Sequence, residues 1–300
     1  MDDVGATRLR LQNLILLGEL LNEMETRTTP RITDADGADN IRARNPLHGF
    51  FRGLGPPGSL TESFFSLCVL CENEIASAIE IFPDSLEVVK QVALDFAANI
   101  ILHADRNCMS EEVRASINSL SIDEAASICV YTMECGPYKG LNKILRDENR
   151  QLIRPFVNYL WLLMHSLRKC PRPTAALVYR GVPRGVSASY IVGSVVTWSS
   201  FSSCTTDVAA LENAMFLGRD GERTEFHITL TTNRARSIRH LSLIPSEDEI
   251  LLPPNTRLRV TGKANKGHGL YVIQLVEEAC LDPILSFPDQ RVSPPLSGIL

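Results

Sequence analysis

The chain changes character at Cys170-Pro-Arg-Pro173, and this change constrains the fold more than any other feature of the sequence. Before it, from residue 59 to residue 169, apolar residues occur mostly at helical spacing. After it come short runs rich in β-branched and aromatic residues, with Gly, Pro and Asn between most of them, as is typical of strands. Helices followed by antiparallel-type strands predict an α+β fold with a helical N-terminal half.

Several helix starts carry recognisable capping signals. Ser59–Glu62 and Ser121–Glu124 have the Ser-x-x-Glu pattern of a capping box. Ser110, followed by two glutamates, predicts the start of a short helix. Breaks fall at Pro83-Asp84 and at Arg154-Pro155. Besides the short helix that begins at Ser110, the predicted helices cover residues 6–21, 59–82, 85–104, 121–133, 138–150 and 152–168.

Six short runs after residue 173 have the composition of strands. They are interrupted by a piece from Thr206 to Phe216 that predicts a helix, with Asp207 near its start. No strand–helix–strand alternation accompanies them, so we expect mostly antiparallel pairing. The predicted strands are residues 176–180, 190–198, 225–231, 249–252, 257–260 and 270–275.

The composition excludes several classes of protein. An apolar fraction of 44% and a charged fraction of 22% are those of an ordinary globular protein. A net charge of −5 argues against a nucleic-acid binder. No apolar run approaches a membrane span, and the acidic start lacks the pattern of a signal peptide. We therefore expect a cytoplasmic protein with neither membrane nor nucleic acid as partner; the mildly basic residues 166–300 would suit an anionic ligand such as a dinucleotide.

The cysteines predict no metal site. Cys68 and Cys71 form a single CxxC in an apolar segment, with no second pair to complete a zinc site. Core packing is the favoured interpretation of this pair, and a redox or metal role is the alternative. The six histidines form no cluster of the metal-binding type.

Three polar features stand out in the strand-rich half, and the first two are Arg180 and the hydroxyl residues around Phe201. Arg180 ends an apolar run, where a guanidinium needs an anionic partner from the protein or from a ligand, and Gly181 permits close backbone approach. Hydroxyl residues crowd Phe201 between Trp198 and Thr206. No Gly-x-Ser-x-Gly elbow accompanies them, so they indicate capping or support of another side chain rather than a nucleophile.

The third polar feature is Glu247-Asp-Glu249, which leads into an apolar run closed by Pro253-Pro254. If residues 247–252 form a strand, Glu247 and Glu249 share one face and Asp248 points the other way. Two like charges at that spacing repel each other. The run is therefore either a solvated strand end or a pair of acids kept for a cationic substrate.

An Arg, a Ser cluster and a Glu-x-Glu in this order resemble the mono-ADP-ribosyltransferases of the Arg–Ser–Glu class. Within that class the chain is most similar to the eukaryotic, ecto-enzyme-like, arginine-specific type. The resemblance covers about residues 120–280 and excludes residues 1–110. The matching segments are Val178–Gly181, Phe201–Thr205, Ser246–Pro254, and upstream Tyr131–Asn142 and Leu145–Arg150.

The resemblance implies a fold and a division of the chain. It predicts a split β-sandwich of mostly antiparallel strands with a helical lead-in, and NAD bound in a cleft between two sheets. Residues 1–58 would be an N-terminal helix and flexible linker, and 59–119 a helical region. Residues 120–282 would be the catalytic domain, with a lead-in at 120–169 and a β core at 174–277, before a tail at 283–300.

The resemblance also implies a reaction, the transfer of ADP-ribose from NAD to a protein arginine without a metal ion. Glu249 would be the catalytic glutamate, and Glu247 would orient the acceptor arginine. Arg180 would grip the NAD phosphates, and the backbone of Gly181 the nicotinamide amide. Ser203 and Thr205 would hold Glu249 and the ribose in place; Thr205 stands where the family has Ser, but keeps the hydroxyl. An NAD glycohydrolase and an inactive binding module of the same fold are the alternatives.

Overall fold

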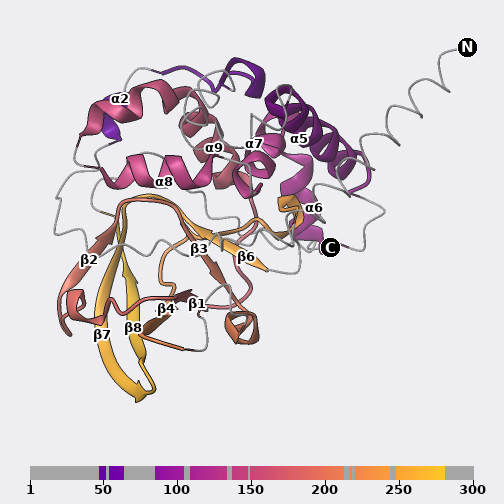
Figure 1. Ribbon diagram of the computed structural model, residues 1–300. Coiled ribbons are helices and arrows are strands. Elements are labelled where there is room, and N and C mark those ends of the chain that lie inside the picture. The colour runs from indigo at the N-terminus through magenta and orange to yellow at the C-terminus, as the bar shows by residue number, and fades with distance from the viewer. Residues whose placement is uncertain are drawn as a thin grey trace, which may run out of the picture.

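The computed structural model describes residues 47–51, 54–63, 85–104, 109–133, 137–147, 149–212, 217, 220–243 and 248–280. The predicted helix at 6–21, most of the helix at 59–82, the Cys68–Cys71 pair and the tail at 283–300 lie outside these residues. Figure 1 shows the described helices gathered on one side of the molecule and the strands on the other. This arrangement agrees with the predicted α+β class.

The helical side contains five described helices of eight residues or more, with shorter turns around them. Among the helices described, none is both long and apolar enough to cross a bilayer. Their bounds are α2 His48–Phe51, α5 Ser85–Leu102, α6 Glu111–Asn118, α7 Ile122–Thr132, α8 Tyr138–Arg146, the 3-10 helix η1 Arg150–Phe156 and α9 Val157–Lys169.

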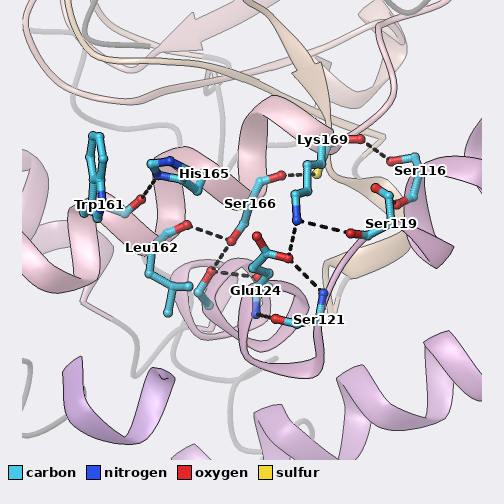
Figure 2. A network of polar contacts seen from close by, with 11 residues as sticks. Ser116, Ser119, Ser121, Glu124, Trp161, Leu162, His165, Ser166 and Lys169 are labelled. Atoms are coloured by element: carbon cyan, nitrogen blue, oxygen red, sulfur yellow. Dashed lines mark hydrogen bonds and ion pairs between the residues drawn. The ribbon is translucent and has the colours of Figure 1, made fainter. Parts of the chain in front are cut away.

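Serine caps begin α6 and α7 where the sequence predicts. Ser121 Oγ accepts from the Glu124 N–H at 3.2 Å, and Glu124 Oε2 accepts from the Ser121 N–H at 2.8 Å, which completes a capping box at the start of α7. Figure 2 shows that the Glu124 carboxylate also pairs with Lys169 of α9, at 2.7 Å. Ser110 caps α6 with a single, exposed contact to the Val113 N–H at 3.3 Å. The box at α7 therefore joins two helices, whereas Ser110 supports only its own.

The predicted helix at 152–168 divides into two pieces. Residues Arg150–Phe156 form a 3-10 helix that contains Pro155, and the α-helix α9 begins at Val157. Proline has no N–H to donate and its ring crowds the preceding turn, so it disfavours a continuous α-helix through this point. Arg154-Pro155 thus marks a boundary two residues before the observed start of α9.

The N-terminal helix and flexible linker predicted for residues 1–58 include one short described helix that the sequence did not indicate. His48–Phe51 form the short helix α2, and Leu47 and Phe51 are buried in the helical core. The Phe51 ring packs against Trp161 of α9, with the ring centres 5.1 Å apart. Trp161 Nε1 donates to the Gly55 carbonyl at 2.8 Å. One buried side chain in a four-residue helix, with Leu47 just before it, leaves no periodic pattern to detect, so tertiary packing decides this segment.

The helices share one apolar core, which crosses the boundary predicted at residue 120. Ala93 and Ala97 of α5 lie in the same core as Ile128 of α7 and Leu163 of α9. Leu251, from the sheet, also belongs to it. The division of the chain at 119/120 stays a prediction, and the described residues on its two sides pack together.

Within the part of the chain that the structure describes, eight strands form one hydrogen-bonded sheet in the order β2-β7-β8-β4-β1-β3-β6-β5. Only β4 and β8 pair in parallel, so the predicted antiparallel character is confirmed for the described strands. The bounds are β1 Leu177–Val182, β2 Val195–Trp198, β3 Ser202–Thr205, β4 Arg223–Thr229, β5 Arg236–Ser237, β6 Glu249–Leu252, β7 Thr256–Gly267 and β8 Leu270–Glu278.

The sheet is narrowest between β1 and β3. Their register consists of the single pair Tyr179 and Thr205, whereas β1 pairs with β4 from Leu177 to Val182. This thin connection separates β3-β6-β5 from the other strands, as a split sandwich requires. Side chains alternate along β6, as in any strand. Ile250 and Leu252 enter the apolar core formed by the sheet, and Leu251 enters the helical core.

Several predicted strands differ from the observed ones at their ends. β2 begins only at Val195, because residues 187–189 form a 3-10 turn and Gly193 has a φ of 89°. β7 extends to Gly267, where a tight turn with positive φ leads into β8. The predicted helix at 206–216 is reduced in the described residues to a 3-10 turn at Val208–Glu212. The pair Arg236–Ser237 forms β5, too short to be recognised from composition.

We predict that Ser121→Ala lowers the free energy of unfolding by about 1–2 kcal/mol, the usual range for a lost N-cap. Ser110→Ala, its matched control, should cost less, about 0.5 kcal/mol, because its single contact is exposed. Urea unfolding of the two variants and the wild type measures the difference. An equal loss in both variants would contradict the joining role of the Ser121 capping box.

A second prediction concerns the buried thiol of Cys204, which lies in the core between the strands. Burial raises its pKa from 9.0 to about 12. Between these values the unfolded chain has lost the proton that the folded chain keeps, so stability must fall as pH rises above 9.0. Cys204→Ala should therefore lose less unfolding free energy than the wild type across this range, in urea titrations at successive pH values. Parallel losses in both proteins would show that the thiol titrates alike in both states.

Candidate active site

The candidate site is built on the neighbouring strands β3 and β6. They pair antiparallel, with Ser203 opposite Leu251 and Thr205 opposite Glu249. Side chains alternate along a strand, so Ser203, Thr205 and Glu249 share one face. Ser203 Oγ donates to Glu249 Oε1 at 2.5 Å, which is short for a hydrogen bond and typical of one to a charged oxygen. The serine motif and the second glutamate, distant in sequence, thus meet directly.

Glu249 is 3% exposed and lies close to other charged and polar groups. Burial raises the pKa of Tyr131 on α7; the hydrogen bond from Asn142 opposes this, and the nearby negative charge of Glu249 adds to it. The positive charges of Arg180 and Arg146 act on the same hydroxyl in the opposite direction. The Tyr131 hydroxyl therefore lies within the field of one carboxylate and two guanidinium groups, at the boundary between helices and sheet.

Arg180 lies on β1, and its side chain crosses the narrow point of the sheet. Its Nη1 donates to the Ser203 carbonyl at 2.7 Å, and its guanidinium carbon lies 5.8 Å from the centre of the Trp198 ring. The side chain is 2% exposed. A planar guanidinium that stacks on an indole ring and bonds a carbonyl is held in one orientation. Arg180 thus fixes the same residue, Ser203, whose hydroxyl holds Glu249.

The other two predicted residues also lie near this point. Gly181 follows Arg180 in β1 and is buried opposite Glu225 of β4. Thr205 ends β3, and its Oγ1 accepts from the Asp207 N–H at 3.1 Å, so its hydroxyl supports the turn that leaves the strand. The structure therefore brings Arg180, Gly181, Ser203, Thr205 and Glu249 to adjoining strands. Their individual roles stay predictions.

The start of β6 differs from the strand considered for residues 247–252. β6 begins at Glu249, and Asp248 before it has a φ of 44°, in the left-handed region. The alternation of a strand does not extend through such a residue, so the condition under which Glu247 and Glu249 would share a face, a strand over residues 247–252, is not met. Glu247 itself lies outside the described residues, as do Ile244 to Ser246.

The helical lead-in supplies residues to which the sequence alone gave no role. Asn142 of α8 donates from Nδ2 to the Tyr131 hydroxyl at 3.0 Å and accepts from the Phe201 N–H at 3.1 Å. One turn later, Arg146 donates to Ser200 Oγ at 3.4 Å. Asn142 thereby joins α7 and α8 to the segment that enters β3. Polar residues four apart on one helical face are the sequence signal that could have indicated this contact.

The exit from β6 is also held by a buried side chain. Arg234 donates from Nη2 to the Pro254 carbonyl at 3.0 Å and from Nη1 to the Asn255 carbonyl at 3.2 Å. Asn255 has a φ of 64°, so the chain turns sharply where these bonds form. The Leu-Leu-Pro-Pro sequence after the acids thus ends in a turn gripped by a guanidinium. Nothing in the sequence around Arg234 marks it for this contact.

Within the described ranges, no three His, Cys, Asp or Glu side chains come together as metal ligands would. What the arrangement offers is a carboxylate oriented by a hydroxyl, with a guanidinium and a phenol beside it. Such a group can stabilise a positive charge that develops next to it.

Comparison with known families and proteins agrees with this geometry. The family model described as NAD:arginine ADP-ribosyltransferase matches residues 95–279. A Mycobacterium avium (strain 104) protein, Mav, whose name describes an NAD(+)–arginine ADP-ribosyltransferase, is 31% identical over 165 residues, 54% of this chain and 18% of that protein. The erythroblast NAD(P)(+)–arginine ADP-ribosyltransferase of Gallus gallus is 31% identical over 147 residues, 46% of each chain. The chain thus spans less than half the length of these curated relatives.

Two solved structures show the same fold. The type III effector XopAI from Xanthomonas axonopodis pv. citri is 16% identical with a TM-score of 0.55, covering 83% of this chain and 96% of that one. The ADP-ribosyltransferase HopU1 of Pseudomonas syringae pv. Tomato DC3000 is 18% identical with a TM-score of 0.50, covering 63% and 87%. At such identities the likeness concerns the fold alone. Since the family model matches more than half of the sequence, the chain belongs to the NAD:arginine ADP-ribosyltransferase family.

Proposed function

We propose that this protein transfers ADP-ribose from NAD to an arginine side chain of another protein and releases nicotinamide. The observation that carries the proposal is the 2.5 Å hydrogen bond from Ser203 to Glu249, which orients a buried carboxylate beside Arg180 and Tyr131. The family to which the chain belongs and the names of its relatives support the same reaction.

The chemistry explains why an oriented carboxylate is needed. The bond between nicotinamide and the ribose is an N-glycoside, and its electron pair leaves with nicotinamide. Positive charge then develops on the ribose, as in the hydrolysis of sugars. Glu249, already held by Ser203, stabilises this charge without having to reorganise. In this proposal the carboxylate meets the developing positive charge, and no metal ion takes part.

The residues around Glu249 would hold the NAD molecule. Arg180 binds the phosphates in this proposal; a guanidinium carries five N–H donors, so one side chain can contact both a carbonyl and a phosphate. The backbone of Gly181 contacts the nicotinamide amide, and Ser203 with Thr205 supports Glu249 and the ribose. The described residues with these roles all lie in the proposed catalytic domain, residues 120–282.

Glu247 would select the acceptor. A carboxylate can accept two hydrogen bonds from a guanidinium and so direct one nitrogen toward the ribose carbon. That nitrogen forms the new bond and releases one proton. Water in place of arginine would give free ADP-ribose, the product of a glycohydrolase.

The first test is the turnover of labelled NAD by Glu249→Gln. The change keeps the shape of the side chain and removes its charge, so turnover should fall roughly a hundredfold or more, the scale for one preorganised group. Glu222→Gln, an exposed position on the turn before β4, is the matched control and should keep wild-type turnover. Near-normal activity of Glu249→Gln would refute the assignment of Glu249 as the catalytic residue.

The second test separates transfer from hydrolysis. Glu247→Gln should depress transfer of label to an arginine analogue far more than release of free ADP-ribose, since only transfer needs the acceptor to be oriented. An equal loss of both products would refute the acceptor role. Wild-type protein that forms only free ADP-ribose would be a glycohydrolase, and one with no turnover would be a binding module.

A further inference from the structure

Glu249 occupies the last rung between β3 and β6. Its pair with Thr205 ends the register, and the next residues outward are Thr206 on one strand and Asp248 on the other. The end of a strand ladder opens more readily than its middle, because fewer hydrogen bonds must break together. The residue proposed to carry the reaction is therefore placed at the end of the β3–β6 ladder, where its pairing with β3 is weakest.

One side-chain contact bridges the two strands beyond that rung, and a second joins Asp248 to the 3-10 turn at Arg239–Leu241. Thr206 Oγ1 donates to Asp248 Oδ2, and Arg239 Nη1 lies 3.4 Å from Asp248 Oδ1. Asp248 adopts a φ of 44°, a left-handed conformation that aspartate tolerates better than most residues. The turn at Asp248 thus leaves its carboxylate between the end of β3 and the 3-10 turn at Arg239–Leu241.

We propose that the Thr206–Asp248 hydrogen bond is a positioning device for Glu249, which holds the last rung closed so that the Ser203–Glu249 contact persists. This inference rests on the proposed function, because it concerns the same carboxylate. It assigns a role to the central acid of the Glu-Asp-Glu run, and to a threonine that lies one residue beyond the strand carrying Ser203. Neither side chain touches the substrate in this role.

The two contacts of Asp248 differ in importance. The Arg239 side chain is 51% exposed and that of Asp248 27%, so their ion pair is screened by solvent and contributes little. Thr206 is half-buried, and a hydrogen bond from its hydroxyl to a carboxylate is of the stronger, charge-assisted kind. The hydroxyl of Thr206 is therefore the group on which the positioning depends, and Arg239 is secondary.

Kinetics of NAD cleavage test the proposal. Thr206→Val keeps the shape of the side chain and removes the hydroxyl, so kcat should fall about tenfold, the change that corresponds to ~1.4 kcal/mol. KM for NAD should stay within about twofold, because the groups proposed to bind NAD remain in place. Thr206→Ser retains a hydroxyl and should restore kcat. Thr229→Val, the same change at an exposed position of β4, should have no effect.

Asp248 gives a second pair of variants. Asp248→Gly allows the left-handed turn but removes both contacts, and should lower kcat as Thr206→Val does. Asp248→Asn tolerates the same turn and keeps an acceptor for Thr206, so it should retain most of the activity. If Asp248→Gly keeps wild-type kcat, or if Thr206→Val raises KM and leaves kcat unchanged, the proposal is overturned.

Amide hydrogen exchange tests the device without reference to activity. The Ile238 N–H donates to the Glu249 carbonyl at 3.0 Å, so its exchange reports on the end of β6. The Ile238 N–H should exchange about tenfold faster in Thr206→Val than in the wild type or Thr206→Ser, for the same loss of free energy. Unchanged exchange refutes the device even if the protein cleaves NAD. Faster exchange in a protein that cleaves no NAD would keep the device and reject the proposed function.

Discussion

The hydrogen bond between Ser203 and Glu249 is the contact on which the rest of the site depends. It joins two strands that lie 46 residues apart in the chain, and it exists only because β3 and β6 pair in one register. A slip by one residue would turn Glu249 into the core between the strands, away from the Ser203 hydroxyl. The apolar residues Cys204, Ile250 and Leu252 prevent this slip, since they fill that core from the opposite face.

The narrow point of the sheet explains how charged groups can lie so deep. Between β1 and β3 the backbone pairing consists of one pair, and Arg180 supplies a side-chain bond to the Ser203 carbonyl at that place. Helices α7 and α8 close the site from the other side, through Tyr131 and Asn142. Each polar group is thus fixed by an element remote in sequence, which gives the preorganisation that electrostatic catalysis requires.

Much of this arrangement could be predicted from the sequence, for reasons visible in single residues. Glu249–Leu252 is a strand with the predicted bounds, because an apolar run closed by two prolines has little alternative. Ser110 and Ser121 begin helices because their side chains satisfy N–H groups that have no acceptor within the helix itself. Both effects depend on residues close together in the chain, so a short stretch of sequence is enough to predict them.

The features that could not be predicted depend on contacts across the fold. The helix at 48–51 exists because Phe51 meets Trp161, more than a hundred residues away. The strand β5 has two residues and is defined by its partner β6. The left-handed turn at Asp248 interrupts the strand alternation considered for residues 247–252. Tertiary contacts from Thr206 and Arg239 meet the carboxylate of Asp248 at this turn. Arg234 donates a hydrogen bond to a turn twenty residues further along the chain, and no residue near Arg234 indicates this contact.

A crystal structure of the protein with NAD bound would test the central claim most directly. The account predicts that the nicotinamide-bearing ribose lies within hydrogen-bond distance of the Glu249 carboxylate, with the phosphates against Arg180 and Ser203 still bonded to Glu249. NAD bound elsewhere on the molecule, or a Glu249 side chain turned away from the ribose, would contradict it.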